Sequence, residues 1–190
     1  MSKIIWPLLL CAVLCGCGGG ETGSAVQEQY RTLETARLEA EVTSHTDTDS
    51  RTFTLLCSYD ADGDAVTTVT APGELAGLTA VVSGADMTLR SEGLQLPAGA
   101  SLDICPANCL PYLLRALADG YVLEQSSEAL DNTPCLRLAL DTTAPGGGKV
   151  LCAVWLDAEG LFPRYAEFSR NEQVVLTVKL LAFTCTTSEG

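Results

Sequence analysis

The segment RTFTLLCSYDADGDAVTTVT, residues 51–70, alternates apolar and polar side chains on both sides of an acidic turn. Side chains in a β-strand point alternately to its two faces, so the first half has an apolar face made of Phe53, Leu55, Cys57 and Tyr59. The turn at 60–64 is rich in Asp and Gly, which tolerate turn conformations. The segment therefore predicts a β-hairpin with one apolar face.

The same alternation continues on both sides of this hairpin. Before it, residues 38–42 alternate as Leu-Glu-Ala-Glu-Val. After it, short runs with period two are separated by turn residues, which predicts an antiparallel meander of about ten strands with short hairpins. The further strands are expected at 75–82, 86–90, 120–125, 134–141, 149–156, 161–170 and 173–183.

Two segments have helical spacing instead. Val26, Tyr30, Leu33 and Ala36 predict a helix from Ala25 to about Arg37, with Ser24 as its N-cap. A second helix is expected at 108–119, with Asn108 as cap and Gly120 as stop, after an apolar loop at 96–106. We expect an α+β, mainly β domain whose helices cover a curled sheet.

The last third of the chain has the driest predicted faces. A β domain either fills such a face with side chains or leaves it hollow for a ligand, and the sequence leaves both alternatives open. The candidate cavity residues lie on two strands and on the middle helix: Leu136, Leu138, Leu140, Val174, Leu176, Val178, Leu180, Leu113 and Leu117.

The first 17 residues have the layout of a secretory signal, with Lys3 followed by a short apolar run. The run is too short to span a bilayer. It ends in Leu14-Cys-Gly-Cys17, which resembles the lipobox of bacterial lipoproteins. The resemblance implies that residues 1–16 are removed and that Cys17 receives a diacylglyceryl group and an acyl chain such as palmitate. An ordinary cleaved signal is the alternative.

Composition limits what the exported chain can bind. Lys3 is the leader's only charged residue, so the mature chain carries 10 basic and 24 acidic side chains. This balance excludes nucleic acid as a natural partner and leaves a lipid as the means of membrane attachment. We expect a lipidated flexible tether at 17–24, one domain at 25–190, and a location on the outer face of the cell membrane.

The sequence contains no recognisable catalytic or metal-binding motif. His45 is the only histidine, and no Cys-x-x-Cys occurs, so we expect no metal, no cofactor and no enzymatic activity. The acidic turn at 60–64 lacks the closing Glu of a calcium loop. Cys105 and Cys109 are a candidate disulfide at the entry of the middle helix, with buried free thiols as the alternative reading of the cysteines.

The phrase Val154-Trp-Leu-Asp-Ala-Glu-Gly-Leu-Phe-Pro-Arg-Tyr-Ala-Glu-Phe168 resembles a hairpin of the LolA/LolB-like lipoprotein carriers. The Pro-to-Leu-Gly step within 70–79 is similar to one in the middle of their sheet. Among lipid-anchored members, the chain resembles the GerS-like germination and sporulation lipoproteins.

This resemblance implies a half-open antiparallel β-barrel with an N-terminal helix and a middle helix as its lid. It implies a lipid-anchored binding protein whose hydrophobic concave face takes a lipid, an acyl chain or a lipoprotein. The alternative that it implies is a non-enzymatic partner of a cell-wall amidase. Cys17 is the one functional residue that carries over.

Overall fold

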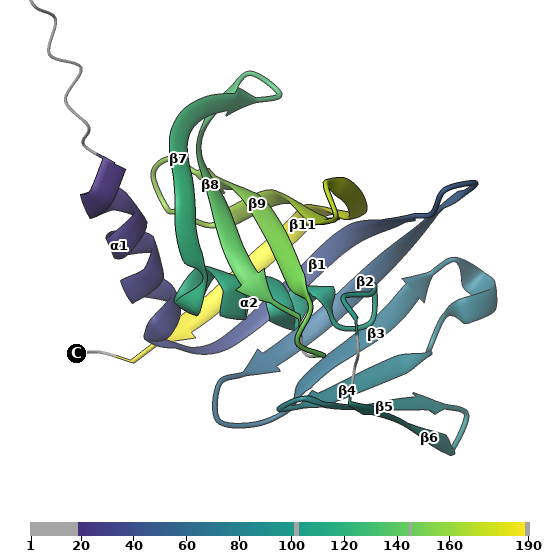
Figure 1. Cartoon of the computed structure of the whole chain (residues 1–190). Coiled ribbons are helices and arrows are strands. Elements are labelled where there is room, and N and C mark those ends of the chain that lie inside the picture. The colour runs from purple at the N-terminus through teal and green to yellow at the C-terminus, as the bar shows by residue number, and fades with distance from the viewer. Residues whose placement is uncertain (1–18, 101–102, 145, 189–190) are drawn as a thin grey trace, which may run out of the picture.

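A computed structural model of the chain describes residues 19–100, 103–144 and 146–188 (Figure 1). Its elements are α1 (Gly19–Arg31), β1 (Leu33–His45), β2 (Ser50–Asp60), β3 (Ala65–Ala71), the short 3₁₀ helix η1 (Gly73–Leu75), β4 (Thr79–Ser83), β5 (Asp86–Ser91), β6 (Leu94–Ala100), α2 (Cys109–Asp119), β7 (Tyr121–Leu130), β8 (Thr133–Thr143), β9 (Lys149–Asp157), β10 (Pro163–Arg170) and β11 (Gln173–Thr187).

The strands form one antiparallel sheet in the order β6-β5-β4-β3-β2-β1-β11-β10-β9-β8-β7. Consecutive strands pair within two meanders, a first of β1 to β6 and a second of β7 to β11, and β1 joins the two by pairing with β11. The sheet is not closed, because β6 and β7 lie at opposite ends of this order. The expected mainly β, half-open architecture with two helices is confirmed.

Helix α2 lies within the curl of the sheet, whereas α1 lies beside it along β7 (Figure 1). Most of α2 is buried, on several sides rather than on one stripe, as expected for a helix with protein around it. Its side chains Leu110, Leu113 and Leu117 are fully buried in one core cluster with Leu38, Leu138 and Phe168 of the sheet. The predicted middle helix is thus confirmed, and it is a core element.

Side chains of α1 attach it to distant turns. Gln27 donates a hydrogen bond to the Gly120 carbonyl (2.6 Å), and the Tyr30 hydroxyl donates one to the Leu161 carbonyl (3.0 Å). Val26 and Tyr30 enter the core cluster. In the part of the chain that the structure describes, no helix is long and apolar enough to cross a membrane.

The first helix is shifted relative to its prediction. It begins at Gly19 and ends at Arg31, so residues 19–24 of the expected tether are helical and the expected residues 33–37 belong to β1. Leu33 and Ala36 fit a helical spacing, but Ala36, Leu38, Ala40 and Val42 also alternate, and pairing with both β2 and β11 favours the strand. Cys17 lies outside the described residues.

One strand was missed by the sequence pattern. Residues 96–106 were expected to be a loop, but β6 extends from Leu94 to Ala100 and pairs with β5. Pro97 argues against a central strand because it has no N–H to donate. β6 is the last strand of the sheet, where proline is tolerated, so the local signal was misleading.

Candidate functional site

An apolar pocket of about 240 Å³ lies on the concave face of the first meander. Side chains of β2 to β5 and of η1 form its walls, and the segment just before α2 closes one side. It is lined by Phe53, Leu55, Thr67, Val69, Leu75, Leu78, Ala80, Met87, Leu89, Cys105, Pro106 and Ala107. Almost all of these are hydrophobic, so the pocket suits a hydrocarbon chain.

The strand register explains why these side chains converge. Cα partners in an antiparallel pair point to the same face, and Leu55 pairs with Val69 while Ala80 pairs with Leu89. Thr67 joins the same face through its pairing with both Cys57 and Ala80. The four strands therefore present one continuous apolar surface toward the inside of the curl.

The position of α2 leaves this surface partly open. The helix fills the concave side of β8 to β11 and reaches across to β2, but its first residue is Cys109. The segment before the helix, Cys105 to Ala107, lines the pocket opposite β3 to β5, whereas α2 reaches the first meander at the β4–β5 turn, where Arg115 donates a hydrogen bond to the Gly84 carbonyl (3.0 Å). Asn108 holds this segment in place, because its side chain accepts a hydrogen bond from the Cys105 N–H and donates one to the Asp103 carbonyl (both 2.8 Å).

An apolar strip continues from the pocket to the free edge of the sheet. Leu96 pairs with Leu89 and therefore lies on the concave face, and Leu94 is on the same face two residues away. Leu94 is 76% exposed and Leu96 is 65% exposed. Since Leu75 at the pocket is also 38% exposed, the hydrophobic surface around the opening is accessible to solvent.

Most of the cavity residues expected from the sequence lie elsewhere. Leu113, Leu117, Leu136, Leu138, Leu140, Leu176 and Val178 are all at most 7% exposed and belong to the core around α2. Leu180 packs against that core. None of the nine lines the apolar pocket.

Val174 departs furthest from the expected face. It is 38% exposed, because a bulge between Phe168 and Ser169 leaves Val175 as an extra residue in β11. At this end of β11 the bulge shifts the alternation of side chains by one residue. Val175 therefore packs against the core in place of Val174.

The cysteines near the pocket are poor nucleophiles. Cys57, Cys105 and Cys109 are free thiols in this structure. The Cys105–Cys109 disulfide remains a prediction from the sequence. Burial raises the pKa of Cys57 to about 11. Burial also raises the pKa of Cys105 and, more strongly, that of Cys109. These thiols are therefore protonated at neutral pH, and the thiolate is the reactive form.

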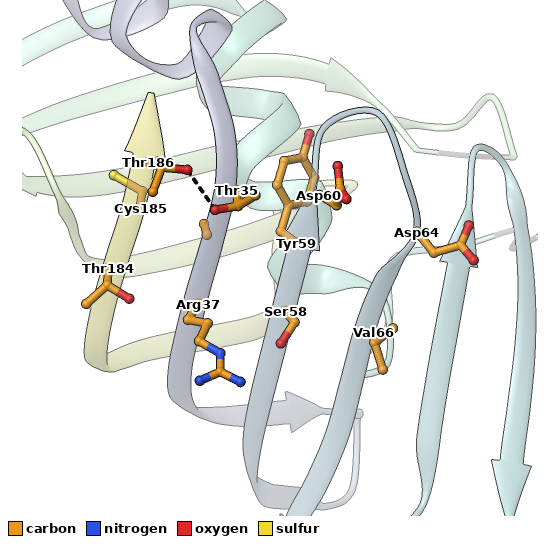
Figure 2. Close-up of a pocket in the computed structure, with 11 residues that line it drawn as sticks. Thr35, Arg37, Ser58, Tyr59, Asp60, Asp64, Val66, Thr184, Cys185 and Thr186 are labelled. Atoms are coloured by element: carbon orange, nitrogen blue, oxygen red, sulfur yellow. Dashed lines mark hydrogen bonds between the residues drawn. The ribbon is translucent and has the colours of Figure 1, made fainter. Parts of the chain in front are cut away.

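A second hollow, of about 400 Å³, is polar and lies where β1, β2, β3 and β11 end (Figure 2). The hydroxyls of Thr35 and Thr186 are hydrogen-bonded to each other there at 2.7 Å. Figure 2 shows Arg37 at the opposite side of the hollow from Asp60 and Asp64. The polar side chains of this hollow lie apart around its rim, so they do not point toward one position where a ligand could bind.

The only histidine lies away from both hollows. His45 is the last residue of β1, and its ring nitrogens lie 3.0 Å from the Ser50 hydroxyl and 3.2 Å from that of Thr177. Both ring nitrogens are hydrogen-bonded to hydroxyls and not to the carboxylate that orients the base in a triad. Over residues 19–100, 103–144 and 146–188, no three His, Cys, Asp or Glu side chains come together to hold a metal ion.

No protein-family model and no curated protein matches the sequence. Among solved structures, a DUF1329 family protein from Desulfovibrio piger matches with a TM-score of 0.54 at 12% identity, over 90% of this chain and 94% of that one. An uncharacterized conserved protein from Thermus thermophilus also gives 0.54, at 9% identity over 89% and 88%. A LolA superfamily protein from Nitrosomonas europaea gives 0.46, at 13% identity over 87% and 94%.

At such identities the likeness concerns the fold alone. The two matches at 0.54 span almost the whole length of both chains, so the curled sheet and its helices are shared as one unit. The fold predicted from the sequence, a curled, half-open antiparallel sheet with two helices, is therefore shared with these two solved structures.

Proposed function

We propose that this chain is a lipid-anchored, extracytoplasmic binding protein that holds a hydrocarbon chain in the apolar pocket of its first meander. The observation that carries the proposal is the pocket of about 240 Å³, walled by hydrophobic side chains and open to solvent beside Leu75. A pocket lined in this way gains free energy by removing apolar ligand surface from water.

The volume limits the part of a ligand that fits. An engineered apolar cavity of about 150 Å³ holds benzene. If a methylene occupies roughly the volume of a water molecule, about 30 Å³, then 240 Å³ accommodates about eight methylenes. One acyl chain enters partway, and its remainder lies across Leu89, Leu94 and Leu96. A whole lipid with two chains does not fit inside.

The chain's own anchor is a poor occupant of this pocket. The expected lipid on Cys17 is two residues from the start of α1, and α1 packs along β7. The pocket lies across the sheet, at β2 to β5. We therefore propose that the ligand comes from another molecule, such as a membrane lipid or the acylated end of a lipoprotein.

The alternative role expected from the sequence, as a partner of a cell-wall amidase, stays a prediction from family resemblance. The apolar lining of the pocket favours hydrocarbon binding instead, because a protein partner does not require such a pocket.

A pair of matched substitutions tests the proposal. Met87 lines the pocket, and Thr88 is the next residue on the opposite face of β5, with a similar partial exposure. We expect Met87→Trp to weaken binding of dodecanoate, measured by calorimetry on the chain beginning at Gly18, while Thr88→Trp leaves it unchanged. Equal binding by both variants, or by neither, would exclude this pocket as the site.

A further inference from the structure

A groove of about 440 Å³ lies between α1 and the free edge of β7. Gly23, Ser24 and Gln27 of α1 form one wall. The other wall is the strand segment from Tyr121 to Gln125. β7 is the last strand of the sheet and pairs with β8, so its second edge faces this groove.

The edge of a sheet presents backbone N–H and C=O groups in the spacing that another extended chain needs. At this edge the side chains are also suited to a partner, because Tyr121 is 73% exposed and Leu123 is 55% exposed. Aromatic and large aliphatic side chains with free surface are common anchors in protein interfaces. An extended polypeptide satisfies both the backbone and these two side chains.

The side chain of Gln125 lies at the closed side of the groove. The side-chain oxygen of Gln125 is buried and has no hydrogen-bond partner. It faces Gly23, where an added Cβ would lie 3.1 Å from it. The contact places α1 directly against this side chain, so the groove is closed at Gly23 and opens along the strand edge.

We propose that the edge of β7 binds an extended segment of a different, positively charged protein by adding a strand beside Tyr121–Gln125. A second copy of this chain is a poor occupant, because each mature copy carries 24 acidic and 10 basic side chains and two copies repel each other. Two carboxylates near the groove, Asp119 and Glu124, have side chains that are 78% and 65% exposed. Asp119 is held by Arg31 in an exposed ion pair, which is weak and can be exchanged for a cation of the partner, whereas the partner of Glu124 is Arg137, whose side chain is 21% exposed.

This interaction is independent of the proposed hydrocarbon binding. The groove lies at the β7 end of the sheet, whereas the apolar pocket lies at β2 to β5. Dodecanoate is therefore expected to leave peptide binding unchanged, so the two proposals fail separately.

The test uses the full mature chain in detergent micelles and the acetylated, fluorescein-labelled peptide KKVTVTVTKK as probe. Fluorescence polarisation measures binding, and hydrogen exchange locates it. We expect slower exchange within Tyr121–Gln125. We also expect at least tenfold weaker binding for the same peptide with alternate amides N-methylated, because it cannot form the ladder, and weaker binding for EEVTVTVTEE.

A substitution on the helix wall provides a second test. Gly23→Leu narrows the groove and is expected to weaken binding at least tenfold, whereas Ala25→Leu, on an exposed position of the same helix, leaves it unchanged. The proposal is overturned if the N-methylated peptide binds as well as the parent, if the protected amides lie in β6, or if the parent peptide does not bind at millimolar concentration.

Discussion

Chain length is the variable that most directly tests the proposed pocket. Each methylene transferred from water contributes about 0.8 kcal/mol, which is about a fourfold gain in affinity. The pocket of about 240 Å³ takes about eight methylenes, at roughly 30 Å³ each. In a series of fatty acids, affinity should therefore rise about fourfold per carbon up to about eight carbons within the pocket.

Beyond that length the slope should fall. Further methylenes lie against Leu94 and Leu96, which line only one side of the chain and leave the other side in water.

The shortest acids should bind weakly. Burying about eight methylenes in the pocket contributes a free energy of about 6 kcal/mol, whereas association costs about 4 kcal/mol or more.

Isothermal titration below each acid's critical micelle concentration measures the series. In Met87→Trp, which reduces the pocket volume, the change in slope should occur at a shorter chain, while Thr88→Trp keeps the wild-type profile. A slope that is constant through the longest acid, or a break at the same length in all three proteins, would refute the assignment of hydrocarbon binding to this pocket.

Three further predictions concern the core, the anchor and acid stability. Phe168 is fully buried with its ring centroid 5.9 Å from that of Tyr112, so Phe168→Ala should destabilise the domain by about 3–5 kcal/mol in urea unfolding, and a loss below about 1 kcal/mol would contradict its place in the core. Cys17→Ala should abolish incorporation of radiolabelled palmitate and release the chain from membranes, whereas Cys15→Ala should retain both; the reverse result would move the anchor. The Asp157 carboxylate accepts hydrogen bonds from the N–H groups of Gly160 and Glu159, which hold its pKa below the ordinary 3.8. Its contribution to stability is therefore complete well above pH 3.8 and is lost as the pH falls through the lower folded-state pKa, so the melting temperatures of wild type and Asp157→Asn should differ at neutral pH and converge in acid; a difference independent of pH would contradict this role.

Much of the sheet follows from local sequence. Alternation around residues 51–70 predicts β2, the turn and β3, and the helical spacing after Asn108 predicts α2 to within a residue. Such signals are local because the periods of strand and helix are properties of consecutive residues. Where two periods coincide, as at Leu33 and Ala36, the sequence favours a helix, and pairing with strands from both ends of the chain decides for β1.

The location of the pocket depends on tertiary structure. Leu138 and Leu55 are both inward-facing residues of alternating strands, and nothing local tells them apart. Leu138 lies in the filled core around α2, whereas Leu55, although also buried, borders the apolar pocket, which the segment 105–107 closes on one side. The hollow thus lies at a part of the sheet where no residue of α2 lines the concave face.

The sequence by itself determined that the domain would be a meander with one apolar face, because residue alternation specifies a strand wherever the strand is later paired. Only the tertiary structure decided which part of that face is filled and which edge stays accessible. A side chain becomes buried through contact with residues far away in the chain, and the position of α2 inside the curl and of α1 along β7 fixes those contacts.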